Sequence, residues 1–213
     1  SRSHLEESMQ RAEGPRSSAL PISASPDQPP TAVAGLVTSC QKGKEQNMST
    51  YYFVPSRNVF GEGSVEETGH LIKSIGGTKA MIVTDAFLAA NPMTTRIQKI
   101  LADAGVQSAV FGKAEPNPKD TNVVEGEQFY HENECDCILS LGGGSSHDCA
   151  KGIGLVATNG GKISDYEGVD QAHEALPPLV AVNTTAGTAS EITRFCIITD
   201  TTRKVKMCIV DWR

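Results

Sequence analysis

Short apolar runs alternate with amphipathic helical patterns from Ser49 onward, and this alternation limits the possible folds more than any other feature. Predominantly apolar runs are typical of strands that are buried on both faces, and here they cover residues 79–84, 108–111, 137–141 and 178–183. Between the runs, apolar residues recur at helical spacing, which predicts helices over residues 65–75, 93–104, 120–134 and 149–157. The pattern predicts an α/β fold, in which a Rossmann-like parallel sheet is covered by helices on both faces.

Some boundaries of these elements carry their own signals. Ser64 and Glu67 have the spacing of a capping box, so a helix is expected to begin there and to stop at Gly76-Gly77. The segment "YYFVPSRNVF", residues 51–60, is expected to be extended. Residues 195–199 and 205–210 are expected to form a pair of strands separated by the polar segment "DTTRK".

Residues 1–47 differ from the rest of the chain, because they are rich in Ser, Pro and Gln and have no helical or alternating period. This composition predicts a disordered leader or an upstream extension, with Met48 as the natural start of the protein. A signal peptide would have a basic start and a longer apolar core, and a transit peptide would avoid acidic residues.

The formal net charge of −6 and the absence of any Lys/Arg cluster argue against nucleic acid and anionic membrane as partners. No apolar run approaches the ~20 residues of a membrane helix. The six cysteines include no C-x-x-C pair, so we expect reduced thiols in a cytoplasmic protein.

Ligands of open parallel sheets bind beyond the carboxyl ends of the strands. In this sequence those ends carry Asp85, the glycines 142–144 and Thr184-Thr185. Because these ends meet at one edge of the predicted sheet, we expect a binding site there.

The three consecutive glycines at 142–144 separate an apolar strand from a helix. Gly loses the most backbone freedom on ordering, so the run indicates that the backbone must approach something closely. The N–H groups and dipole of the following helix favour an anion, and a pyrophosphate would fit. The alternative is a tight turn and a helix capped by Ser145 or Ser146. The segment is not G-x-G-x-x-G, because His147 replaces the third glycine, and it is not a P-loop.

The other two strand ends leave alternatives open. A carboxylate at Asp85 is suited to a ribose diol, but it is equally suited to capping the next helix. Thr184, Thr185 and Thr188 offer hydroxyl groups beside Ala186-Gly187, although an ordinary polar loop has the same composition.

His147 and Asp148 are neighbours in the first turn of the helix after the glycines, and they point about 100° apart. We expect His147 at the rim of the site, while Asp148 either complements the helix dipole or belongs to the site. The five histidines show no i, i+3 or i, i+4 pairing, so the residues of this chain alone build no metal site.

Six segments between about Met48 and Asp211 are specific when taken together: "FVPSRNVFGEGSV", "IVTD", "AEPNP", "ILSLGGGSSHDCAKGIGLVATNGGKISDYEGVD", "AVNTTAGTASEITRFCIITD" and "KVKMCIVD". They resemble the iron-containing (group III) alcohol dehydrogenases, and bacterial methanol-, ethanol- and propanediol-type dehydrogenases are especially similar. The resemblance implies that residues 48–213 form a dehydroquinate synthase-like α/β domain that binds NAD. In the family, an all-helical domain that holds a divalent metal, usually iron, follows this domain.

The resemblance also implies roles for individual residues. In the family pattern, Asp85 lies at the adenosine ribose and favours NAD, Asn117 lies near the cofactor, and Lys206 matches a lysine that reaches the ribose. The remaining cofactor-binding residues implied by the pattern lie on the phosphate and nicotinamide side or in the same motif: Gly143, Gly144, Ser145, Asp148, Thr184, Thr185 and Thr188.

The metal ligands of the family, one Asp and three His, lie downstream of the matched segments. We therefore expect this chain to be the cofactor half of an enzyme that transfers hydride between a short-chain primary alcohol, or a diol, and NAD, truncated before the metal domain and inactive alone. The intact enzyme is expected to be a homo-oligomer. The alternative is a non-catalytic nucleotide-binding or interaction module; a kinase is disfavoured because no organised set of Mg²⁺ carboxylates is present.

Overall fold

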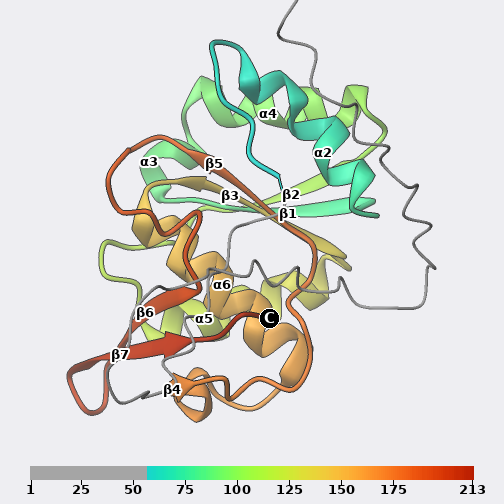
Figure 1. Ribbon diagram of the computed structural model, residues 1–213. Helices are drawn as coiled ribbons and strands as arrows, with labels where there is room; N and C mark the ends of the chain where they lie inside the picture. Colours follow the sequence, from blue (N-terminus) through green and yellow to red (C-terminus); the bar gives the residue numbers. More distant parts are fainter. Residues whose placement is uncertain (1–56) are drawn as a thin grey trace, which may run out of the picture. The chain divides into compact units, whose positions relative to one another are not determined.

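A computed structural model describes residues 57–213 of the chain (Figure 1). Within these residues, four parallel strands form one sheet in the order β2-β1-β3-β5. The strands are β1 (Lys79–Val83), β2 (Gln107–Phe111), β3 (Cys137–Gly142) and β5 (Leu179–Asn183). The predicted parallel sheet is therefore confirmed. The central strand β3 is buried along its whole length, which explains its continuous apolar run.

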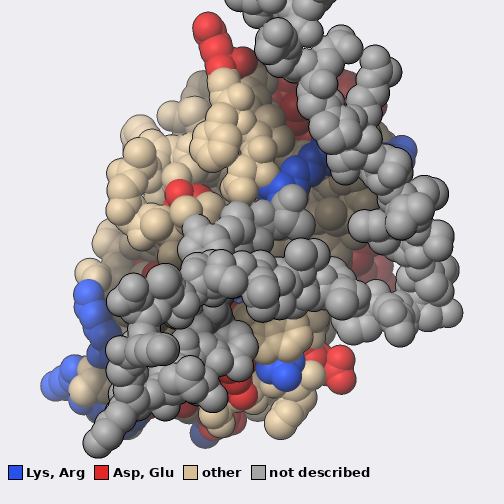
Figure 2. Space-filling view, viewed as in Figure 1, with Lys and Arg blue, Asp and Glu red and all other residues tan. Residues whose placement is uncertain are grey.

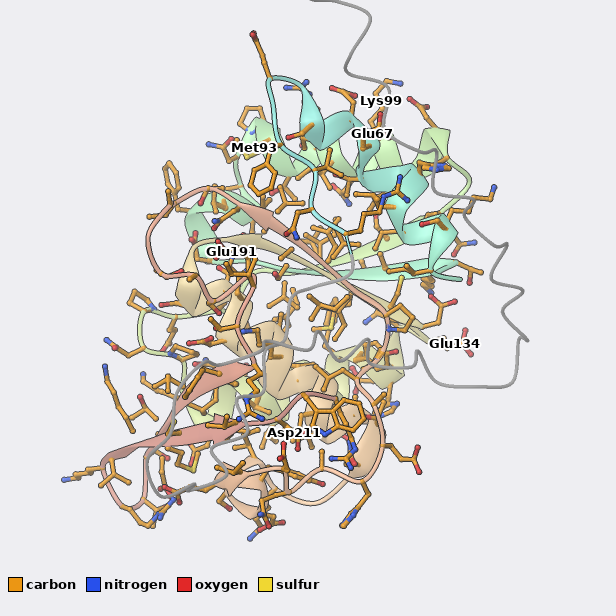
Figure 3. All side chains as sticks on the ribbon, viewed as in Figure 1. Glu67, Met93, Lys99, Glu134, Glu191 and Asp211 are labelled. Carbon is orange, nitrogen blue, oxygen red and sulfur yellow. The ribbon has the colours of Figure 1, made fainter. Side chains whose placement is uncertain are left out.

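Helices cover both faces of this sheet (Figure 1). Side chains of a strand alternate between the faces: Ile82 packs with α2 (Thr68–Ser74) and α4 (Pro92–Asp103), while Met81 packs with α5 (Asp120–Glu132) and α6 (Gly144–Asn159). In Figure 3, Lys99 of α4 and Asp211, which follows β7, lie on opposite sides of the sheet. The expected helices are all present.

A second sheet lies against the outer side of α6 (Figure 1). In the described residues it has three strands in the order β4-β7-β6: β4 (Gly168–Val169), β6 (Phe195–Asp200) and β7 (Val205–Val210). Strands β6 and β7 are antiparallel, which confirms the predicted pair. The sequence pattern did not indicate a second sheet. Ile198 and Met207 share a buried cluster with Ile153 of α6, so this helix is enclosed between two sheets.

The start of the first helix differs from the prediction. A 3-10 turn, η1 (Ser64–Glu67), precedes α2, and its N-cap residue is Gly63, whose φ of 79° is left-handed. The side chains of Ser64 and Glu67 form no capping box, so that prediction was wrong. Residues 57–60 have no regular structure. The rest of the expected extended segment and the expected leader, 1–47, lie outside the described residues.

None of the helices in residues 57–213 is both long enough and apolar enough to cross a membrane. In the same part of the chain the cysteines are free thiols, and of these only Cys208 is exposed. On the face shown in Figure 2, the visible charged side chains are interspersed with uncharged ones, and several basic groups lie around the turn between β6 and β7.

Candidate functional site

The carboxyl ends of β3 and β5 bring the glycine run and the threonine loop side by side. Gly142 pairs with Asn183 in the sheet register. The next amide along β5, the N–H of Thr184, donates to the carbonyl oxygen of Gly142 over 2.9 Å. The expected convergence of these loops at one edge is confirmed.

Glycine is required at positions 142, 143 and 144 for different physical reasons. Gly142 has a φ of 146°, and a Cβ atom there would lie 2.4 Å from Oγ of Ser146, so the turn itself requires glycine. Gly143 and Gly144 have ordinary φ angles, but Cβ atoms on them would lie 3.3 Å from Thr185 and 3.0 Å from Thr188. The second and third glycines therefore allow the threonine loop to approach the backbone closely.

The start of α6 has Gly143 as its N-cap residue, and no side chain caps it. The alternative that Ser145 or Ser146 caps this helix was wrong; Ser146 is instead buried beneath Gly142. The first-turn N–H groups and the positive end of the helix dipole therefore have no capping oxygen among the described side chains. This arrangement suits an anion.

A cleft of about 310 Å³, lined by polar and apolar residues, lies in front of this helix start. It is bordered by the segment before α5, the start of α6, the loop after β5, and strands β6 and β7. Several predicted site residues line it, and they are Asn117, Gly144, Ser145, Asp148, Thr188 and Lys206. The other lining residues were not predicted as site residues from the sequence: Pro118, Ser190, Thr193, Phe195, Ile197 and Thr199.

Four of the predicted residues, Asp85, Gly143, Thr184 and Thr185, do not line the cleft itself. Gly143 and Thr185 lie close to each other, because a Cβ atom on Gly143 would be 3.3 Å from the side chain of Thr185. Oδ1 of Asp85 accepts a hydrogen bond of 2.8 Å from the N–H of Leu88 and caps the short helix α3 (Ala86–Ala89). The capping role of Asp85 is thus realised in the structure.

The ammonium group of Lys206 lies at the cleft wall formed by β7. Nζ of Lys206 donates a hydrogen bond of 2.6 Å to Oδ1 of Asn117. Asn117 adopts a left-handed φ of 53°, which Asn tolerates better than most residues. The loop before α5 and the second sheet therefore meet at this pair.

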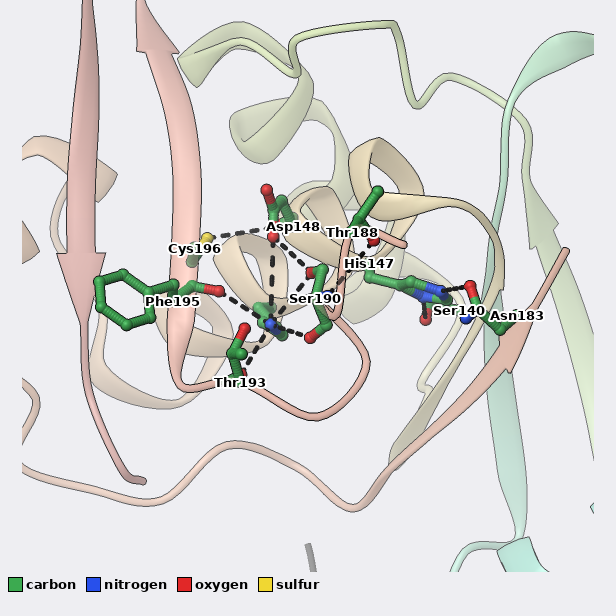
Figure 4. A network of polar contacts seen from close by, with 10 residues as sticks. Ser140, His147, Asp148, Asn183, Thr188, Ser190, Thr193, Phe195 and Cys196 are labelled. Atoms are coloured by element: carbon green, nitrogen blue, oxygen red, sulfur yellow. Dashed lines mark hydrogen bonds and ion pairs between the residues drawn. The ribbon is translucent and has the colours of Figure 1, made fainter. Parts of the chain in front are cut away.

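Asp148 lies in the cleft wall next to Ser190, whose Oγ donates to Asp148 Oδ1 over 2.6 Å (Figure 4). Burial raises the pKa of Asp148, and the bond from Ser190 and the nearby charge of Lys151 oppose this rise. Lys151 Nζ lies 4.0 Å from Asp148 Oδ1. Asp148 thus lies in the wall of the cleft.

His147 is not at the rim of the site, so that expectation was wrong. The side chain is 1% exposed, with Nδ1 2.5 Å from Ser140 Oγ and Nε2 3.1 Å from Asn183 Oδ1 (Figure 4). Burial lowers its pKa, which favours the neutral imidazole. The reason is geometric: the residue faces the sheet from α6, while Asp148 faces the cleft.

A parallel sheet covered by helices on both faces, with strand ends and an uncapped helix start that border a cleft, defines a Rossmann-like α/β protein. The model of the family "iron-containing alcohol dehydrogenase" matches residues 55–213. The chain belongs to the iron-containing alcohol dehydrogenase family.

Individual proteins are similar over the same region. The NAD-dependent methanol dehydrogenase of Bacillus methanolicus is 49% identical over 162 residues, which are 76% of this chain and 42% of that enzyme. A crystal structure of 1,3-propanediol oxidoreductase superposes with a TM-score of 0.75 at 45% identity, covering 78% of this chain and 43% of the other. A crystal structure of a sulfoacetaldehyde reductase of Bifidobacterium kashiwanohense in complex with NAD⁺ superposes with a TM-score of 0.68 at 29% identity. The match covers 78% of this chain and 44% of the reductase. The chain thus spans well under half the length of these relatives.

No group of three or more His, Cys, Asp or Glu side chains within residues 57–213 could hold a metal ion. The residues described here therefore do not fit the metal that the family name implies.

Proposed function

We propose that residues 48–213 form the NAD-binding portion of a metal-dependent alcohol dehydrogenase that transfers hydride between a short-chain primary alcohol, or a diol, and NAD. The uncapped start of α6, which opens onto a cleft lined by hydroxyl groups and by Lys206, carries the proposal. The similarity to an NAD-dependent methanol dehydrogenase and to a 1,3-propanediol oxidoreductase supports the substrate class.

In this proposal the diphosphate of NAD binds at the N–H groups of Gly143, Gly144 and Ser145, where the helix dipole adds a favourable partial charge. Thr185 and Thr188, whose side chains lie close to Gly143 and Gly144, supply hydroxyl groups to the same phosphates. When bound, NAD supplies the hydride acceptor of the reaction.

Other residues orient the two ends of the nucleotide. Lys206 and Asn117, whose side chains are hydrogen-bonded to each other, bind a ribose of NAD at their side of the cleft. Asp85 accepts hydrogen bonds from the adenosine ribose and repels a 2′-phosphate. Asp148 adds a polar group to the cleft wall, and we assign Thr184, which lies outside the lining, to the phosphate and nicotinamide side of the cofactor.

We further propose that this chain alone binds the nucleotide without turnover, since its described residues offer no ligand set for a metal. A metal held elsewhere in an intact enzyme would polarise the alcohol oxygen. The competing proposal is a non-catalytic nucleotide-binding or interaction module.

A fluorescence titration with NADH tests the first proposal. Saturable binding supports it, and no binding at millimolar NADH contradicts it. An oxidation assay with NAD, Fe(II) or Zn(II) and short alcohols tests the proposal that this chain alone has no turnover. Metal-dependent turnover by this chain would contradict the expectation that the metal ligands lie outside residues 57–213. Joining the chain to the metal domain of a relative distinguishes the two proposals. Alcohol oxidation by the fusion protein would support the NAD-binding portion of a dehydrogenase, and its absence would support a non-catalytic module.

A further inference from the structure

The loop between β5 and β6 carries Thr185 and Thr188, and two side chains of α6 hold this loop at its opposite ends (Figure 4). We infer that His147 and Lys151 are positioning residues that clamp the segment 183–195 and so preset the threonine side of the proposed nucleotide site. The effect of the clamp on nucleotide binding rests on the proposed function, whereas the effect of the clamp on loop order does not.

Lys151 holds the C-terminal end of the loop. Its Nζ donates to the carbonyl oxygens of Ser190, Thr193 and Phe195, the last two over 3.0 and 2.8 Å. Its side chain is only 16% exposed, and the carboxylate of Asp148 is no closer than 4.0 Å. A nearly buried ammonium is costly unless its donors are satisfied, and here backbone carbonyls of one short segment satisfy them. Its charge thus holds the loop.

His147 holds the N-terminal end of the loop. Oδ1 of Asn183 can only accept, so Nε2 of His147 carries the proton and donates to it. Nδ1 then accepts from the hydroxyl of Ser140 on β3. The imidazole therefore ties the last residue of β5 to the neighbouring strand, one position before Thr184.

Between the two clamps, the N–H of Thr184 donates to Gly142 and the hydroxyl of Ser190 donates to Asp148, and the exposed residues 185–188 lie between these two contacts. Residues 184–188 are exposed, Gly187 has a φ of 117°, and Ala189 has a left-handed φ of 56° that is unfavourable for a residue with Cβ. Such a conformation persists only where surrounding contacts determine it. A loop held in place before the nucleotide arrives loses less conformational freedom on binding.

Nitrogen-15 relaxation on the 213-residue chain tests the clamp. Order parameters of residues 184–195 should be near 0.85 in the unmodified chain, and they should fall below about 0.6 in Lys151→Met, as in flexible backbone. Values for β3 should stay unchanged. Lys113→Met is the matched control, because Lys113 makes an exposed ion pair with Glu125 away from the cleft; it should leave the loop rigid.

Conservative variants separate positioning from general destabilisation. Lys151→Arg retains a positively charged donor and should recover part of the loop order. The recovery should be incomplete, because a planar guanidinium fits three carbonyl oxygens arranged around one nitrogen atom poorly. His147→Gln can keep a donor near Asn183 and should protect residues 184–186 better than His147→Leu. If Lys151→Met does not fold, the Arg variant decides: loss of order confined to 184–195 supports the clamp, and equal loss throughout overturns it. A rigid loop in Lys151→Met also overturns it.

Affinity provides the link to the proposed function. NADH should bind Lys151→Met about tenfold more weakly than the unmodified chain, because the ordering cost moves into the binding step. If the unmodified chain binds no NADH while the variants still loosen the loop, the proposed function fails and the clamp stands. If NADH binds and the loop order never changes, the clamp fails alone.

Discussion

Nζ of Lys206 and Oδ1 of Asn117 lie 2.6 Å apart, although 89 residues separate them in the chain. This hydrogen bond joins β7 of the second sheet to the loop before α5. It places an ammonium group beside the same cleft onto which the start of α6 opens. The second sheet thus contributes directly to a site that the sequence pattern had located at the edge of the parallel sheet.

Replacing Lys206 by Met should weaken NADH binding about three- to tenfold, because one charge-assisted hydrogen bond at a solvated cleft is lost. The melting temperature should change little. Lys204→Met, a change in the same hairpin at a residue that does not line the cleft, is the control for fluorescence titration. Equal affinity in both variants would remove Lys206 from the site.

Two substitutions of Asp85 separate its capping role from its proposed role at the ribose. Ser caps helices about as well as Asp, so Asp85→Ser should keep stability, while Asp85→Ala should lose about 0.5–2 kcal/mol in urea unfolding. Both remove the charge, and both should raise the affinity for NADPH relative to NADH. An unchanged preference in Asp85→Ser would show that the carboxylate only caps.

The glycine run should respond differently at its first two positions. Gly142→Ala should destabilise the chain by about 1–3 kcal/mol, because of its φ of 146° and the contact with Ser146. Gly143 has a φ of −99°, so Gly143→Ala should fold normally and lose about tenfold in NADH affinity by filling space beside Thr185. Thermal unfolding and titration measure the two effects. Identical behaviour of the two variants would contradict this division of roles.

Acid should weaken a contact at the opposite edge of the sheet. The carboxylate of Asp136 accepts from the N–H groups of Thr78 and Lys79, both over 2.9 Å. Burial opposes its ionisation, but the hydrogen bond from the Thr78 hydroxyl, together with these two N–H bonds, outweighs burial and holds the pKa of Asp136 below its usual 3.8. Its stabilisation is therefore present above pH 3.8 and is lost as the pH falls through the lower pKa of the folded state.

Urea unfolding between pH 7 and 3 measures this effect. Asp136→Asn should lower stability at pH 7 by less than about 1 kcal/mol, because the side chain is exposed, and should flatten part of the acid dependence. Asp103→Asn, which removes an exposed i, i+4 ion pair with Lys99, serves as the control. An acid dependence that is the same in Asp136→Asn and the unmodified chain would contradict this origin.

The strands and helices of the parallel sheet were predictable because each follows from a local apolar period. Ile82 and Met81 alternate between two helix layers as strand geometry requires. The convergence of Gly142 and Thr184 was also predictable, since parallel strands place their carboxyl ends together.

The remaining errors arise where tertiary contacts decide. The orientation of α6 between two sheets buries His147 and directs Asp148 to the cleft, and no local period distinguishes these neighbours. The contacts of Lys151 with carbonyl groups 39 to 44 residues away depend on a loop path that composition does not encode. The capping box at Ser64 failed because Gly63 allows a left-handed entry into a 3-10 turn.

An NMR titration of the nitrogen-15-labelled chain with NAD⁺ tests the central claim most directly. Our account predicts saturable shifts of the amide signals of Gly143, Gly144 and Ser145, with smaller shifts at Thr185 and Thr188. Absence of binding, or saturable binding that leaves the amides at the start of α6 unmoved, would contradict it.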